Sequence, residues 1–143
     1  MSIHFFHEDV SLPAFSQSKI INWIDSCIKN ENMSTGNINY IFVSDNYLLK
    51  INKQYLGHDY YTDIITFDYC KDGIVNGDIF LSIPRITENA KIFNQDFYTE
   101  LFRVMIHGIL HLIGFQDKTE AEKKQMREKE EEALKKLNIQ EVV

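Results

Sequence analysis

Residues 101–117 of the chain read LFRVMIHGILHLIGFQD, and this stretch decides the fold. Apolar residues fall on nearly every side of the helix that the pattern predicts, which is typical of a helix buried at the centre of a domain. Thr99 can cap its first turn, and Gly114 can end it because glycine readily adopts the left-handed conformation found at helix ends. The sequence therefore predicts a buried helix from about residue 99 to Ile113.

Two histidines of this helix, His107 and His111, share one face because residues four apart lie one above the other. Asp117 follows the glycine by three residues, the spacing of the third ligand in metzincin-like sites, with Gln116 and Glu120 as alternative ligands. Two imidazoles and a carboxylate that leave a fourth position open are typical of a catalytic zinc centre, with one zinc per chain. The alternative is a pair of core histidines bonded to backbone carbonyls. The pattern favours a metal-dependent hydrolase.

The residue that follows the first histidine separates two kinds of zinc hydrolase. Zincin peptidases carry a glutamate there, which acts as the general base. In this chain the position is occupied by Gly108. The sequence therefore argues against peptide hydrolysis.

Composition bounds the class of protein. With 143 residues the chain is expected to form one domain, 1–143, and an apolar content of 44% excludes a disordered chain. The net charge of −6 argues against general affinity for nucleic acid, although seven of the 15 Lys and Arg residues lie between Lys118 and Lys136 and could form a local basic groove.

The expected location is the cytoplasm. No apolar run reaches the length of a membrane span, and the first eight residues lack the basic start and apolar stretch of a signal peptide. Cys27 and Cys70 are too few for a disulfide scaffold, so both thiols are expected to be reduced.

Periodicity and turn residues predict an α+β fold with the order β-α-β-α-β-β-α-α-α. Asp72-Gly73 and Asn76-Gly77 mark a turn region between the last two strands, which are expected to be antiparallel. The result is a single domain in which helices surround a four-stranded mixed sheet and the buried, metal-binding helix is central. The predicted strands are 3–7, 38–44, 62–69 and 78–83; the predicted helices are 16–30, a short one after Ser44, 84–93, 99–113, and a last one capped by Thr119 and Glu122.

A second group of polar residues, His58, Asp59, Thr62 and Asp63, lies within 52–67, NKQYLGHDYYTDIITF. Taken alone, it is typical of a loop that enters a strand. Together with the histidine segment, however, it resembles the YbeY family of bacterial rRNA maturation endoribonucleases. The family motifs are His-Gly-x-Leu-His-Leu-x-Gly-aromatic-Asp-His and Asn-x-x-Tyr-Arg-Gly-x-Asp-x-x-Thr-Asp-Val-Leu-Ser-Phe. The likeness runs from Asn52 to Asp117, and the strand start at Gly77-Asp78 also fits.

The chain departs from these motifs at three positions. Asp117 stands where the family has its third histidine, Gln116 where it has the preceding aspartate, and Leu56 where it has an arginine. Aspartate is also a zinc ligand. The loss of the arginine predicts slow catalysis unless a neighbour such as His58, Lys53 or Arg85 substitutes.

The resemblance implies zinc-dependent cleavage of single-stranded RNA in rRNA processing and ribosome quality control. It implies rRNA and the small ribosomal subunit as partners, with neither DNA nor a membrane expected. Candidate catalytic residues are His58, Asp63 and Asp78, and Arg85, Lys53 and Lys91 are candidates for holding phosphates.

Two rival readings stay open. One is a metallohydrolase that acts on peptides or small molecules. The other is a non-catalytic ribosome-associated factor with structural zinc, although structural zinc sites are usually closed, four-ligand sites rich in cysteine.

Overall fold

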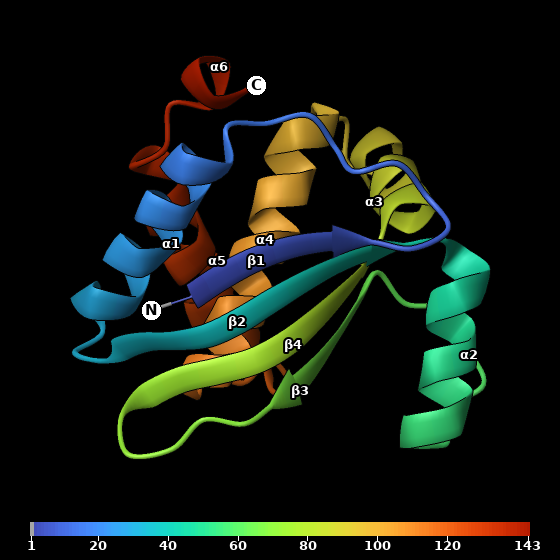
Figure 1. The fold of residues 1–143 in the computed structure, drawn as a ribbon, viewed down its shortest axis with the longest axis horizontal. Coiled ribbons are helices and arrows are strands. Elements are labelled where there is room, and N and C mark those ends of the chain that lie inside the picture. Colours follow the sequence, from blue (N-terminus) through green and yellow to red (C-terminus); the bar gives the residue numbers. More distant parts are fainter. Residues whose placement is uncertain (1) are drawn as a thin grey trace.

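A four-stranded mixed sheet forms the framework of the computed structural model, which describes residues 2–143 (Figure 1). The strand order is β1-β2-β4-β3; the first three of these strands are parallel, and β3 runs antiparallel to β4. This confirms the predicted α+β class and the mixed sheet. The strands are β1 (Ser2–His7), β2 (Ser34–Val43), β3 (Ile64–Asp68) and β4 (Ile74–Ser82).

Within residues 2–143, six helices accompany the sheet, one more than predicted. The main core lies on one face, where α1 and α4 pack over strand residues such as Ile38, Tyr40 and Ile79, while α2 covers a smaller cluster that includes Ile65 (Figure 1). The helices are α1 (Gln17–Asn30), α2 (Asp45–Leu56), α3 (Ile83–Ile92), α4 (Phe97–Ile113), α5 (Glu120–Lys135) and the additional α6 (Ile139–Val142).

Helix α4 is the buried central helix that the sequence predicts, and it lies unusually close to the sheet. A Cβ atom at Gly108 would come within 2.9 Å of the Ile64 side chain and 3.2 Å of Ile79. A Cβ atom at Gly77 of β4 would come within 2.8 Å of both Leu112 and the Phe67 carbonyl oxygen. The two glycines thus let α4 approach β3 and β4, which fixes the height of the helix above the sheet.

Several predicted boundaries are wrong: β2 begins at Ser34 rather than at residue 38, and β3 begins at Ile64 rather than at residue 62. Two further differences concern α4 and β4. Asp96 rather than Thr99 caps α4 by accepting a hydrogen bond from the Tyr98 amide, and the earlier start adds aromatic residues that pack along the helix. The β3–β4 turn involves Asp72 and Gly73, which both have positive φ, so β4 begins at Ile74 and its start includes the residues read from sequence as a second turn.

Helix α5 begins at the predicted capping box of Thr119 and Glu122 and packs against α4. It is also tied to α1, because the buried Trp23 indole N–H donates to the Ala133 carbonyl oxygen over 2.8 Å. Within residues 2–143, no helix has both the length and the apolar character required to cross a bilayer.

Candidate metal centre

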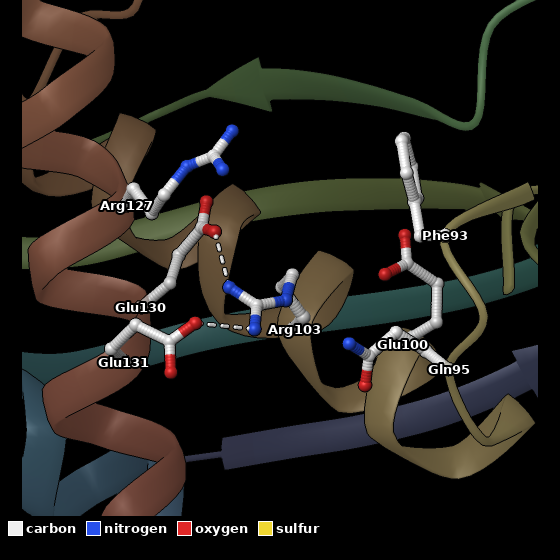
Figure 2. Close-up of a pocket in the computed structure, with 7 residues that line it drawn as sticks. All are labelled: Phe93, Gln95, Glu100, Arg103, Arg127, Glu130 and Glu131. Atoms are coloured by element: carbon white, nitrogen blue, oxygen red, sulfur yellow. Dashed lines mark hydrogen bonds and ion pairs between the residues drawn. The ribbon is translucent and has the colours of Figure 1, made fainter.

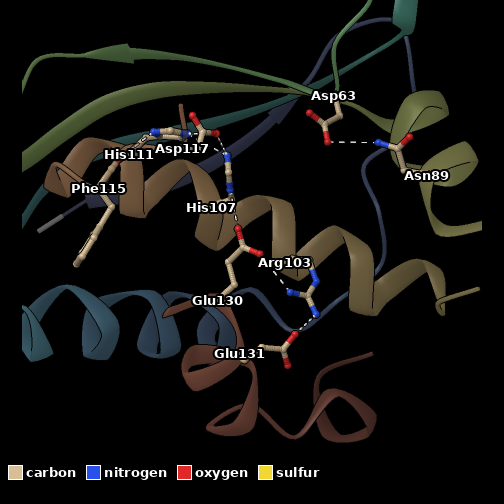
Figure 3. Close-up of polar contacts among 9 residues, drawn as sticks. All are labelled: Asp63, Asn89, Arg103, His107, His111, Phe115, Asp117, Glu130 and Glu131. Carbon is tan, nitrogen blue, oxygen red and sulfur yellow. Dashed lines mark hydrogen bonds and ion pairs between the residues drawn. The ribbon is translucent and has the colours of Figure 1, made fainter. Parts of the chain in front are cut away.

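Two turns of α4 and the loop that follows bring three potential ligands together (Figure 3). The Nε2 atoms of His107 and His111 are 3.0 Å apart. Asp117 Oδ2 lies 3.4 Å from the first of these atoms and 3.1 Å from the second. The chain can turn back at once because Gly114 ends the helix with φ of +126°. The side chains are 22%, 24% and 40% exposed, in chain order, so the group opens to solvent.

These separations fit a tetrahedral metal ion. Zinc binds nitrogen and oxygen ligands at about 2.0–2.1 Å, so two ligand atoms of a tetrahedral site lie about 3.3 Å apart. The three observed distances fall between 3.0 and 3.4 Å.

The Nδ1 atoms of both imidazole rings are hydrogen-bonded, and this determines the protonation of the Nε2 atoms that face each other. His107 Nδ1 donates to Glu130 Oε2 over 2.6 Å, and His111 Nδ1 donates to the Phe115 carbonyl oxygen over 3.0 Å. In the neutral rings the lone pairs therefore lie on Nε2, facing each other and the Asp117 carboxylate. Three acceptor atoms at this separation repel one another unless a proton or a metal ion lies between them. The donor set thus fits a bound metal ion.

The environment of His107 is more polar than that of a core histidine. Burial lowers its pKa, but the hydrogen bond and the charge of Glu130 raise it, and the result is a pKa above the usual value. This is the direction that a histidine beside a fixed carboxylate is expected to show.

The alternative third ligands are less well placed than Asp117. Glu120 is 95% exposed and its carboxylate lies 3.7 Å from Lys123 Nζ. The Gln116 amide nitrogen approaches the Gly114 carbonyl oxygen at 3.5 Å. Of the two carboxylates, Asp117 and Glu120, only Asp117 belongs to the group whose ligand atoms lie within 4.8 Å of one another in the described part of the chain.

A cavity of about 600 Å³ opens beside the three ligands. His58 and Asp63, two of the candidate catalytic residues, line it together with His107, His111 and Asp117. This volume lies in the range of ordinary small-molecule sites. The structure therefore brings the loop before β3 and the histidine helix to one site, although 44 or more residues separate them in sequence.

Within this cavity, Asp63 has the properties expected of a proton-transferring group. Burial raises the pKa of Asp63, and this outweighs the opposing effects of the His107 charge and of the Asn89 amide, which donates to Asp63 Oδ2 over 3.4 Å. A carboxyl group with a raised pKa beside a metal-binding group is typical of catalytic sites. His58 instead stacks on Tyr60 with 5.1 Å between ring centroids and is exposed.

Other candidates lie elsewhere. Gly77 and Ile79 of β4 face α4. Asp78 lies between them, so its side chain points to the opposite face of the sheet, and there it accepts a hydrogen bond from Asn39. Arg85 pairs with Asp45 over 2.7 Å, and Lys53 pairs with Asp59 over 3.2 Å. These three candidates, Asp78, Arg85 and Lys53, and also Lys91 are absent from the lining of the metal-site cavity in the described part of the chain.

Comparison with known proteins identifies a family for this chain. A family model described as Endoribonuclease YbeY matches residues 2–138. The chain belongs to the YbeY family. An Endoribonuclease YbeY of Flavobacterium psychrophilum is 48% identical over 134 residues, covering 94% of this chain and 96% of the relative. One of Parabacteroides distasonis is 46% identical, covering 94% of each chain.

The fold comparison agrees with the family. The solution structure of a Thermotoga maritima protein superposes with a TM-score of 0.63 and 29% identity, covering 94% of this chain and 90% of that one. At the position where the YbeY motif carries its arginine, Leu56 lines the cavity beside the ligands.

Sequence reasoning did not single out three residues of α5 that lie beside the candidate ligands. A smaller cavity of about 200 Å³, on the α5 side of the ligands, is lined by His107 and Asp117 together with Lys123, Arg127 and Glu130. Figure 2 shows the adjoining cavity of about 350 Å³ between α4 and α5, where Arg103 bonds Glu130 and Glu131. The only sequence signal was the cluster of basic residues after Lys118, which marked α5 but not its orientation.

The raised pKa of Asp63 predicts a gain in stability when its charge is removed. Below its ordinary pKa of 3.8, Asp63 is protonated in both the folded and the unfolded chain. As the pH rises the unfolded chain ionises first, so the stability that protonated Asp63 contributes is lost as the pH passes through the raised, folded-state pKa. Asp63→Asn should therefore raise the free energy of unfolding at neutral pH, and the gain should vanish at acid pH.

Urea unfolding of the metal-free protein at several pH values measures this effect, because a bound cation would itself lower the pKa of Asp63. Asp59→Asn is the matched control, since Asp59 is exposed on the same loop. Equal stability of wild type and Asp63→Asn at neutral pH would contradict the expectation.

Proposed function

We propose that this chain is a zinc-dependent endoribonuclease of single-stranded RNA and that His107, His111 and Asp117 hold one zinc ion. The supporting observation is the convergence of two imidazole Nε2 atoms and one carboxylate oxygen within 3.0–3.4 Å, with both Nδ1 atoms already bonded. Membership of the YbeY family supports RNA as the substrate.

The choice of zinc follows from the donor set. Two imidazoles and one carboxylate in a tetrahedral arrangement suit zinc, and three protein ligands leave a fourth position open for substrate or water. When bound, zinc supplies a Lewis acid that can polarise a phosphoryl oxygen or lower the pKa of a water.

Asp63 is our proposal for the group that accepts a proton from the attacking oxygen. It lines the same cavity as the three ligands, and its raised pKa brings it closer to the operating pH of a general base. His58 is in the same cavity and can donate a proton or bind a phosphate oxygen. Asp78 is not part of this proposal because its side chain lies on the other face of the sheet.

Positive charge near the ligands supports a phosphate-bearing substrate despite the acidic net charge. Lys123 and Arg127 line the cavity on the α5 side of His107 and Asp117. Both are exposed and can reach phosphate oxygens of a strand that crosses the site. We propose rRNA as the substrate, the small ribosomal subunit as its setting and the cytoplasm as the location, on the ground of the family.

The position after the first histidine weighs against peptide hydrolysis. A side chain at Gly108 would start 2.9 Å from Ile64 and 3.2 Å from Ile79, so it would point into the sheet. A glutamate there could not reach a substrate at the ligands without moving the helix. The general base must therefore come from another element, such as the loop that carries Asp63.

Cleavage of labelled RNA tests the proposed function. We expect slow, zinc-dependent cleavage of single strands and resistance of duplexes, whose backbone is held away from the in-line geometry that hydrolysis needs. Binding should weaken with salt, because only a local basic surface attracts phosphates. Gel electrophoresis of the products, with and without a chelator, measures the activity.

His111→Ala purified in the same way controls for contaminating ribonuclease. His4→Ala is the matched histidine control, since His4 is exposed on β1, and it should cleave as the wild type does. Equal cleavage by wild type and His111→Ala would refute the proposal and favour a non-catalytic factor.

A further inference from the structure

Helix α5 carries a buried carboxylate that contacts His107 through Nδ1, the ring nitrogen that is not a candidate ligand atom. Glu130 is 8% exposed, and its two oxygens bind different partners. Oε2 accepts from His107 Nδ1 over 2.6 Å, and Oε1 accepts from the Arg103 guanidinium over 3.1 Å (Figure 3). Arg103 in turn donates to Glu131 over 2.6 Å. A buried charge is costly unless it is paired, and Glu130 is paired at both oxygens.

We propose that Glu130, held in place by Arg103, is a positioning residue that fixes the orientation and tautomer of His107 and thereby sets the metal affinity of the site. This inference rests on the proposed function only in taking the three ligands to bind zinc.

The two histidines differ in how they are held. The Nδ1 of His111 donates to the carbonyl oxygen of Phe115, four residues ahead, so the loop directly after its own helix fixes this ring. The Nδ1 of His107 depends on Glu130, which lies 23 residues away on another helix. A neutral imidazole can carry its proton on either nitrogen, and only the form with the proton on Nδ1 presents a lone pair to the metal. Docking of α5 therefore completes the site.

Arg103 determines where the Glu130 carboxylate can lie. Arg103 lies four residues before His107 on α4, so the two side chains lie one turn apart on the same face of the helix. Its guanidinium, 22% exposed, binds Glu130 and Glu131 through separate nitrogens. One cation thus spans two carboxylates, of which only Glu130 touches the imidazole. The other carboxylate provides a control in the same ion-pair network.

Zinc affinity measured by competition with a chromophoric chelator tests the inference on the full chain. Replacing a carboxylate that bonds a metal-ligating histidine typically weakens metal binding about 10–100-fold. We expect Glu130→Gln to fall near about tenfold, because the amide oxygen can still accept from Nδ1, and Glu130→Ala near about 100-fold. Glu131→Gln should stay within about twofold of wild type, as for a surface substitution.

The tautomer of His107 is a second readout, and it needs no metal. In the metal-free protein, at a pH where the ring is neutral, nitrogen–proton correlation spectra should show the proton on Nδ1 in wild type and in Glu131→Gln. In Glu130→Ala the proton should redistribute towards Nε2. A purely structural role for Glu130 would lower stability without moving the tautomer.

The outcomes separate this inference from the proposed function. Equal zinc affinities for Glu130→Gln and Glu131→Gln would overturn it, and so would an unchanged tautomer in Glu130→Ala. If Glu130→Ala fails to fold, the two glutamine variants decide. If wild type binds no zinc, the proposed function fails, and the metal-free spectra still decide whether Glu130 positions the ring.

Discussion

Replacing His111 with alanine is expected to lower the zinc content of the purified protein from about one ion per chain to less than about 0.1 and to abolish RNA cleavage. The physical reason is the loss of the ligand whose Nε2 lies 3.0 Å from the other imidazole and 3.1 Å from Asp117. Two ligands then remain, one of them a 40% exposed carboxylate, and they cannot hold the ion against solvent.

Elemental analysis after dialysis measures the zinc, and circular dichroism shows whether the fold persists. The histidine is 24% exposed at the end of α4, so the alanine variant should stay folded. His107→Ala should lose the metal as well, whereas His4→Ala should retain it. Undiminished zinc in both His107→Ala and His111→Ala would contradict the site assignment.

Substitutions at Asp117 have the second largest expected effect. Asp117→Ala should weaken zinc binding more than about 100-fold, beyond the range seen for residues that only support a ligand. Asp117→His should keep the metal, because an imidazole restores a third donor, as in the three-histidine motif of the family. The ligands would then carry no negative charge, so the site should be more positive.

Chelator competition on the three proteins gives the affinities. Gln116→Ala is the neighbouring control and should bind zinc as the wild type does, since its side chain amide contacts the Gly114 carbonyl oxygen. Tight zinc binding by Asp117→Ala would mean that another residue is the third ligand.

The convergence of the three candidate ligands was predictable because it depends on local geometry. The spacing of His107 and His111 places them on one helix face, and Gly114 turns the chain back within three residues of Asp117. The position of Asp78 could also have been read from sequence, since Ile79 and Leu81 alternate towards the core and leave Asp78 on the other face.

Glu130 could not be predicted in the same way. It lies in a helix rich in charged residues, among Lys129, Glu131 and Glu132, and nothing in the pattern distinguishes it from its neighbours. Its burial depends on how α5 rotates against α4, which long-range packing decides. The start of β4 was misread for a related reason: Asn76-Gly77 has the composition of a turn, but the absence of a side chain at Gly77 leaves room for Leu112 of α4.

The contact between Trp23 and α5 gives the protein an optical reporter. Trp23 is the only tryptophan in the sequence, and its indole is buried with its N–H donated to the Ala133 carbonyl oxygen, one turn beyond Glu130. Detachment of α5 would expose the ring to water and shift its emission to longer wavelength. Intrinsic fluorescence can therefore report, without any label, whether α5 is packed in place beside the candidate ligands.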